Sequence, residues 1–164
     1  MRAPVKCRSY GRMGSYLVVM DETEEARVAL RFAAHRAART NNALEILALI
    51  PPQEFVQWGG VQAAMEEEAK LRAEAMVVEA SGAIFEEAGI RPSILVREGD
   101  PVKIIEEVIK ERPDLAALVL GASSESGPGP LISHFAGAAA GALPCPLIIV
   151  PAALGDDALA ALAS

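Results

Sequence analysis

The feature that most constrains the fold is a series of short apolar runs separated by segments with helical periodicity. The runs are nearly continuous rather than alternating, which is typical of strands buried on both faces of a parallel sheet. Parallel strands need long crossover connections, usually helices. The pattern therefore predicts an α/β protein with an open five-stranded parallel sheet and helices on both faces, a Rossmann-like sandwich. The predicted strands cover residues 15–21, 43–50, 92–98, 115–121 and 146–151.

Residues that start and stop helices mark the segments between these runs. Acidic residues begin the first segment, and Asn41 with Asn42 predicts its end. Gly89 ends a long second helix, and Asp100 followed by Pro101 starts the third. A stretch rich in alanine and glycine predicts a last, small-residue helix. The predicted helices cover residues 22–42, 61–87, 99–114 and 130–143.

Composition narrows the functional classes. The chain has 164 residues, enough for one domain with its own core. Its formal net charge of −7 argues against nucleic-acid binding, which needs a basic surface. No Asp, Glu, Lys or Arg lies between Glu125 and Asp156, but prolines interrupt this stretch, so no membrane span is expected. Cys7 and Cys145 suit neither a disulfide framework nor a zinc site, which predicts a cytoplasmic protein with reduced thiols.

The two ends of the chain differ from the predicted domain at residues 15–151. Residues 1–14 form a basic arm without acidic residues, which either contacts an anionic partner or is a solvated start. Residues 152–164 form a tail in which Leu159 and Leu162 predict a short amphipathic helix. The basic residues of the arm are Arg2, Lys6, Arg8 and Arg12.

Three segments form one pattern by their order and spacing: "YLVVMDETEEARVALRFAA", "VREGDPVKIIEEVIKERPDLAALVLGA" and "LPCPLIIVP". Together they resemble the universal stress protein family over residues 15–151. The resemblance implies an adenine-nucleotide alpha-hydrolase-like fold and, in one branch of the family, ATP or AMP binding, with Mg²⁺ present only alongside nucleotide. It also implies a homodimer paired through the last strand, at Leu147, Ile148, Ile149 and Val150.

The resemblance further implies where phosphates would bind. After the fourth strand, ATP-binding members carry a glycine, two residues, a second glycine, nine residues and then Gly-Ser or Gly-Thr. Glycines let backbone N–H groups approach phosphate, and a hydroxyl adds a donor. Gly121 matches the first glycine, Ser124 replaces the second, and Ser133 with His134 replaces the final pair after a stretch one residue short. The predicted phosphate loop also includes Ser123, Gly127 and Gly129.

Three further positions match the nucleoside end of the family site. Asp21 matches the aspartate near the nucleoside, Leu49 the apolar residue beside the base, and Gly99 the turn glycine. From the residues alone, Asp21 has two roles that do not exclude each other. It can hydrogen-bond a ribose or base, or it can cap the following helix, with Glu24 completing a capping box. Glu125 in the loop would repel a phosphate.

No catalytic set can be assembled from this sequence. A nucleophile with its base and a P-loop lysine are both missing, so no enzyme, catalytic residue or metal site is expected, although weak ATPase activity stays open. We expect Cys145 to be a small buried hydrophobe and His35, in the middle of a helix, to face solvent.

Two functions remain open. The first is a noncatalytic cytoplasmic protein of the stress response with a degenerate adenine-nucleotide cleft, acting through dimerisation and partner contacts. The second is a ligand-free regulatory interaction module. Both predict a homodimer, so ligand occupancy separates them, and the identity of a protein partner is not predicted.

Overall fold

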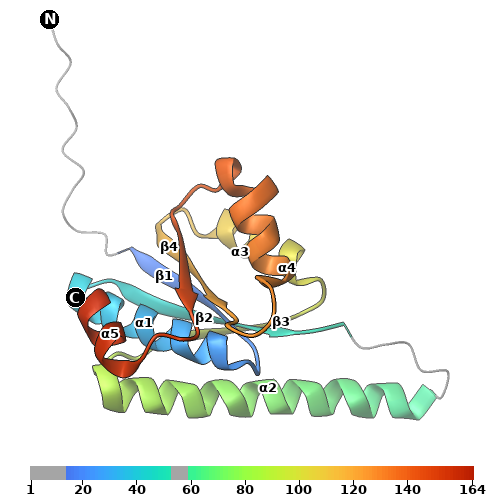
Figure 1. The fold of residues 1–164 in the computed structure, drawn as a ribbon. Helices are drawn as coiled ribbons and strands as arrows, with labels where there is room; N and C mark the ends of the chain where they lie inside the picture. The colour runs from blue at the N-terminus through green and yellow to red at the C-terminus, as the bar shows by residue number, and fades with distance from the viewer. Residues whose placement is uncertain (1–13, 53–58) are drawn as a thin grey trace, which may run out of the picture.

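The computed structural model describes residues 14–52 and 59–164. All four basic residues of the predicted arm therefore lie outside the described residues. Figure 1 shows a single sheet between two layers of helices. In chain order the elements are β1 (Ser15–Met20), α1 (Glu24–Thr40), β2 (Ala43–Ile50), α2 (Gly59–Ala88), β3 (Ser93–Glu98), α3 (Pro101–Glu111), β4 (Leu115–Ala122), α4 (Gly129–Ser133), the π-helical turn η1 (His134–Ala138), the 3-10 turn η2 (Ala140–Ala142), β5 (Leu147–Pro151) and α5 (Asp156–Leu162).

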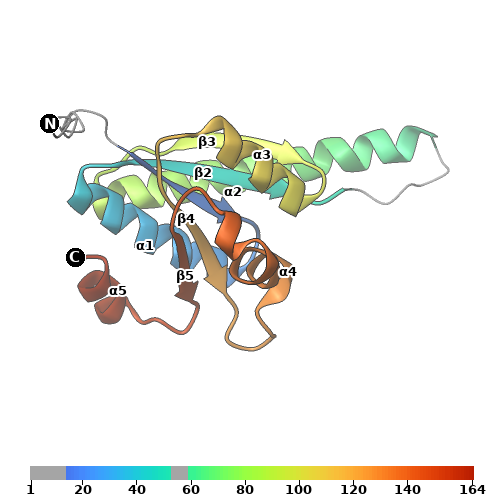
Figure 2. The ribbon, with the colours of Figure 1, turned by 90° about the horizontal axis from the view of Figure 1, so that it is seen from above.

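The predicted open parallel sheet is confirmed. Its five strands are all parallel and follow the order β3-β2-β1-β4-β5. Helices α1, α2 and α5 cover one face, and α3 with the α4 segment covers the other (Figures 1 and 2). The chain winds outward in one direction from β1 and then returns to place β4 on the other side of it. The sheet therefore has a topological switch point between β1 and β4, where a crevice forms at the carboxyl ends of the strands.

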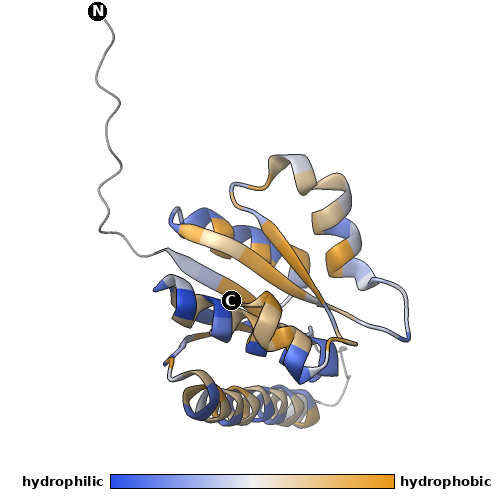
Figure 3. Cartoon of the chain, turned by 60° about the vertical axis from the view of Figure 1, so that its left-hand side comes forward, coloured by the Kyte–Doolittle hydropathy of each residue, from blue (hydrophilic) through white to orange (hydrophobic). Residues whose placement is uncertain are grey.

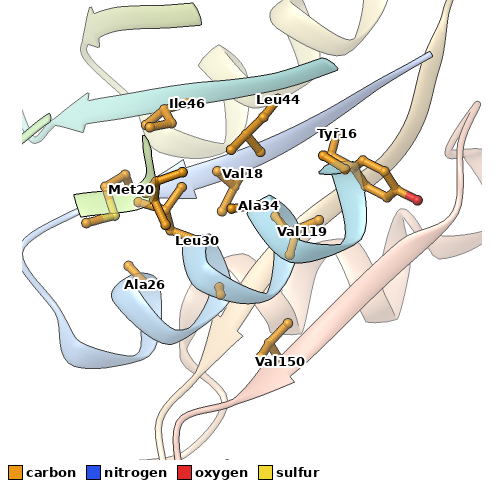
Figure 4. Packing of buried hydrophobic residues seen from close by; sticks show 14 of the residues in the cluster. Tyr16, Val18, Met20, Ala26, Leu30, Ala34, Leu44, Ile46, Val119 and Val150 are labelled. Carbon is orange, nitrogen blue, oxygen red and sulfur yellow. The ribbon is translucent and has the colours of Figure 1, made fainter. Parts of the chain in front are cut away.

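Alternate residues of β1 supply two separate hydrophobic layers. Val18 and Met20 point toward α1 and α2, where they pack with Leu30 (Figure 4). Leu17 and Val19 belong to the opposite layer, beneath α3 and the α4 segment. Each fully buried aliphatic side chain contributes about 2 kcal/mol to folding. Figure 3 shows strong hydrophobic colouring along the strands, which lie between the two hydrophobic layers.

Continuous burial holds for the central strands but not for the edges. Every residue of β1 is buried, and β2 is buried from Leu44 to Ile50. In contrast, β3 has no buried residue and β5 has only Val150. The expectation of strands buried on both faces is therefore wrong for β3 and β5. Their position at the two edges of the sheet is the reason, because the helices cover the middle most completely.

Most predicted helix boundaries are confirmed by the backbone. Asn41 ends α1 in the left-handed conformation with φ 55°, and Gly89 follows α2 with φ 69°. The Asp100 carboxylate accepts a hydrogen bond of 3.0 Å from the Lys103 N–H at the start of α3. The tail contains α5, with Leu159 buried and Leu162 exposed. Among the helices in the described part of the chain, none is long and apolar enough to cross a bilayer.

The predicted small-residue helix over residues 130–143 is wrong. The helical turn α4 has five residues and is followed by a π-helical turn and a 3-10 turn. Gly137 has a non-helical backbone, with φ −104° and ψ −105°. Glycine costs about 1 kcal/mol in a helix relative to alanine, so the segment bends there at little expense.

Candidate functional site

A cleft of about 370 Å³ opens at the switch point, at the carboxyl ends of β1, β2 and β4. Its volume lies in the range of small-molecule sites in proteins. The walls are mostly apolar, as expected for a site that holds an aromatic ring. Strands, α3 and α4 all contribute to the apolar walls, through Val19, Leu49, Leu120, Val102, Leu131 and Ile132.

The structure brings some of the predicted site residues together and leaves others apart. Asp21, Leu49, Gly121 and Gly129 line the cleft. Gly99 lies one residue before Asp100, which also lines it, and has φ 135° in the turn after β3. The remaining predicted residues do not line the cleft: Ser123, Ser124, Gly127, Ser133 and His134.

Asp21 follows β1 directly and is held by Thr23. The Oδ1 atom of Asp21 accepts a hydrogen bond of 2.9 Å from the Thr23 N–H and a second, short one from the Thr23 hydroxyl. The N-cap of α1 is Thr23, whose hydroxyl oxygen accepts from the Ala26 N–H at 3.3 Å. The prediction that Asp21 caps this helix with Glu24 is therefore wrong, because Asp21 lies two residues too early. Both its bonds to Thr23 use Oδ1, so its second carboxylate oxygen can accept from a ligand.

Gly121 lies within β4 rather than in the loop after it, and pairs with Val150 of β5. A Cβ at this position would lie 2.2 Å from the Glu25 carbonyl oxygen, at the start of α1. No side chain fits there, because Cβ atoms do not approach backbone atoms so closely. The glycine is thus required by the packing of β4 against α1, a cause that the sequence pattern does not reveal.

The loop after β4 uses its own hydrogen-bonding groups. The Ser123 hydroxyl oxygen accepts from the N–H groups of Glu125 and Ser126, at 3.2 and 3.3 Å. Those two N–H donors are therefore directed at Ser123 and not at the cleft. Pro128 and Pro130, which do line the cleft, have no N–H group. At these four positions the loop consequently offers no donor to an anion in the cleft.

Ser133 and His134 stand at the junction of α4 and η1, outside the lining of the cleft. The Nε2 atom of His134 is 3.0 Å from Glu106 Oε1, and the imidazole packs edge-on against Phe135 with ring centroids 4.9 Å apart. Ser133 is exposed. His134 of the predicted final pair is thus engaged with α3, and Ser133 beside it does not line the cleft.

Two acidic residues of the cleft were missed by sequence reasoning. Glu25 from the first turn of α1 and Asp100 from the N-cap of α3 line the cleft together with Asp21, and no described Lys or Arg does. Asp100 could have been found, because it follows the end of β3 and the carboxyl ends of parallel strands share one edge. Glu25 gives no such signal. Within residues 14–52 and 59–164, no group of three or more His, Cys, Asp or Glu side chains is placed to hold a metal ion.

Two other features are candidate sites by their chemistry. A second cleft of about 450 Å³ lies between α2 and the ends of β1 and β2, and shares Asp21 and Leu49 with the first. Gly121 and Gly129 line only the cleft at the switch point, which therefore holds more of the predicted site residues. Cys145 packs against the α3-side layer, and burial raises the pKa of its thiol. That is the environment of an unreactive cysteine.

The comparisons with known proteins agree with this architecture. The family model described as "Universal stress protein family" matches residues 14–151. The chain is similar to the universal stress protein UspA from Lactobacillus plantarum, with a TM-score of 0.72 and 19% identity over 85% of this chain and 98% of that one. It is also similar to a protein of the universal stress protein family from Burkholderia pseudomallei, with a TM-score of 0.65 and 16% identity over 84% and 96% of the two chains.

A third similar structure is the universal stress protein from Archaeoglobus fulgidus in complex with dAMP. Its TM-score is 0.52, with 20% identity over 85% of this chain and 98% of that chain. Likenesses at these identities show the fold alone. A search of curated proteins gives no match.

Proposed function

The chain belongs to the universal stress protein family, and from this premise we propose that it is a noncatalytic member whose switch-point cleft binds an adenine nucleotide, ATP or AMP, weakly. It acts in the stress response through dimerisation and contacts with a protein partner. Mg²⁺ enters only with the nucleotide, and the setting is the cytoplasm, as the sparse cysteines predict.

The observation that carries this proposal is the cleft itself. Its walls are mostly apolar, with Leu49 contributed by β2 and Val102 by α3, and such walls suit a purine ring. Asp21 stands at the end of β1 with one carboxylate oxygen not used by Thr23, and a carboxylate accepts from a ribose hydroxyl or an amino group. The dAMP complex of the Archaeoglobus fulgidus protein supports the ligand class.

Weak binding follows from the loop after β4. Two of its N–H groups donate to the Ser123 hydroxyl oxygen. Pro128 and Pro130 have no N–H group to offer a ligand. A phosphate cradle needs several convergent backbone donors. We therefore expect the base and ribose to supply most of the affinity, and turnover to be negligible.

Dimerisation is proposed through β5. This strand is the last in the sheet order and pairs only with β4 among the described strands. Ile149 on it is 40% exposed. An apolar edge strand is a template for pairing with another chain, and an antiparallel twin strand would pair along Leu147, Ile148, Ile149 and Val150.

The same edge favours the second candidate, a ligand-free regulatory interaction module. An apolar groove of Phe32, Leu154 and Leu162 continues from β5 toward α5. Such a surface serves protein contacts whether or not the cleft holds a ligand. The two candidates differ in whether nucleotide binds.

Titration calorimetry with AMP and ATP, with and without Mg²⁺, tests the proposal. We expect dissociation constants on the order of 100 μM, weakened at least about tenfold in Val102→Trp, because the indole fills the cleft. Val78→Trp, the same change on an exposed position of α2, is the matched control and should bind normally. No heat up to millimolar nucleotide would favour the ligand-free module, and binding unaffected by Val102→Trp would contradict the assigned cleft.

A further inference from the structure

We infer that the cleft selects the uncharged nucleoside, adenosine, over its phosphorylated forms. The inference rests on the proposed function and specifies the ligand class of the same site. Two properties of the lining residues carry it: the sign of their charges and the kind of hydrogen-bonding group that they offer.

Among the described residues, the charges that line the cleft are all negative. Asp21, Glu25 and Asp100 come from the end of β1, the first turn of α1 and the N-cap of α3, so three elements each contribute an acidic residue. In the part of the chain that the structure describes, neither lysine nor arginine lines this cleft, and Arg72 lines the adjoining cleft instead. A phosphate in the cleft would therefore meet repulsion without a compensating cation among the lining residues.

That repulsion is large enough to decide between ligands. At contact distance in water, two like charges change a binding constant roughly fivefold, and more where the walls exclude water. A phosphate of AMP near even two of the three carboxylates would lose about tenfold or more in affinity. Each further phosphate of ATP adds to the loss, unless it extends into solvent.

The hydrogen-bonding groups point to the same ligand. Ionised carboxylates only accept hydrogen bonds. Adenosine offers donors, namely its ribose hydroxyls and its exocyclic amino group, whereas an ionised phosphate offers acceptors alone. The backbone donors that a phosphate needs are reduced here, because Ser123 accepts from two loop N–H groups and Pro128 and Pro130 lack them. The site is therefore suited to a ligand rich in donors.

The test compares adenosine, AMP and ATP by titration calorimetry of the full chain at low ionic strength without Mg²⁺. We expect adenosine to bind at least about tenfold tighter than AMP, and ATP to bind no tighter than AMP. Glu25→Gln should reduce the preference for adenosine, expressed as the ratio of the AMP and adenosine dissociation constants, at least about threefold, because it removes one of the negative charges.

Glu24→Gln is the matched control. It makes the same charge change one residue away in the same turn of α1, on an exposed side chain that does not line the cleft. The ratio in this variant should equal that of the unaltered chain. Equal effects of the two substitutions would overturn the inference, because the selection would then depend on overall charge.

The outcomes separate the inference from the proposed function. If AMP or ATP binds tighter than adenosine, the inference is overturned and the proposed nucleotide cleft stands. If none of the three ligands binds up to millimolar concentration, the proposed function fails and the inference falls with it.

Discussion

Gly121 of β4 faces the backbone of Glu25 so closely that a Cβ on the glycine would lie 2.2 Å from the Glu25 carbonyl oxygen. This contact joins the end of β4 to the first turn of α1, and both elements contribute walls of the cleft. In the family pattern this glycine lets the backbone approach a phosphate. Here Gly121 is required by the close packing of β4 against α1. A substitution of Gly121 tests packing as well as binding.

Gly121→Ala should destabilise the protein by about 3 kcal/mol, because β4 and α1 must separate to admit the methyl group. The free energy of unfolding in urea measures this. Gly127→Ala is the control, since a Cβ at position 127 meets nothing within 4 Å, and its effect should stay below about 0.5 kcal/mol. Equal stability of the two variants would show that the approach of β4 to α1 is not tight.

Arg112→Ala should cost about 2 kcal/mol of stability. The Arg112 Nε and Nη2 atoms donate to the two carboxylate oxygens of Glu45 at 2.9 and 2.8 Å, and Glu45, near the start of β2, is only 7% exposed. Removing the guanidinium leaves that carboxylate buried without its partner. Lys110→Ala, in the last turn of α3 just before the C-cap Arg112, should change the free energy of unfolding by less than about 0.5 kcal/mol. A similar effect of both substitutions would contradict the assigned role.

Stability should fall in acid partly through Glu87. The pKa of Glu87 is lowered from its ordinary value of 4.5, first because Arg31 donates to its carboxylate and then because His35 does. A lowered pKa in the folded state stabilises the fold above the unfolded pKa, and this contribution is lost as the pH falls below about 4.5. Because the pair is about one-third exposed and screened, we expect about 0.5 kcal/mol.

Urea unfolding at pH 7 and at pH 3 measures this contribution. Glu87→Gln should be less stable than the unaltered chain at pH 7 by that amount, and the difference should shrink toward zero at pH 3. Glu86→Gln changes an exposed neighbouring carboxylate and should lack the effect. A difference that persists unchanged at pH 3 would mean that the stabilisation does not depend on the charge of Glu87.

The oligomeric state should depend on the β5 edge and not on the β3 edge. Ile149→Lys places a charge on β5, where the proposed twin strand would pair, and should convert a dimer to a monomer in sedimentation velocity runs. Ile94→Lys is the matched control, because Ile94 is 44% exposed on β3, the opposite edge of the sheet. A dimer that survives Ile149→Lys but dissociates with Ile94→Lys would move the interface to β3.

Local signals in the sequence predicted the fold well. Apolar runs marked the strands, and Asn41 and Asp100 marked helix boundaries through left-handed backbone and side-chain capping, which act within a few residues. The position of the cleft also follows, since parallel strands present their carboxyl ends at one edge. These properties depend on chain neighbours or on topology.

The features that escaped prediction depend on contacts between distant residues. The close approach of Gly121 to Glu25 and the pairing of His134 with Glu106 join separate elements. Likewise, His35 keeps a quarter of its side chain exposed, but the sequence did not predict that its Nε2 lies 2.8 Å from Glu87 Oε1 on α2. Periodicity along the chain carries no information on such pairs.

The most direct test of the central claim is an amide NMR titration of the ¹⁵N-labelled protein with adenosine and with AMP. The method detects weak binding because the ligand can be added to millimolar concentration. The account predicts progressive shifts at Asp21, Val102, Gly121 and Leu131 around the cleft, with no shift at Val78 on the outer side of α2. An unchanged spectrum, or shifts confined to β5 and α5, would contradict the account and leave the chain as an interaction module without a nucleoside site.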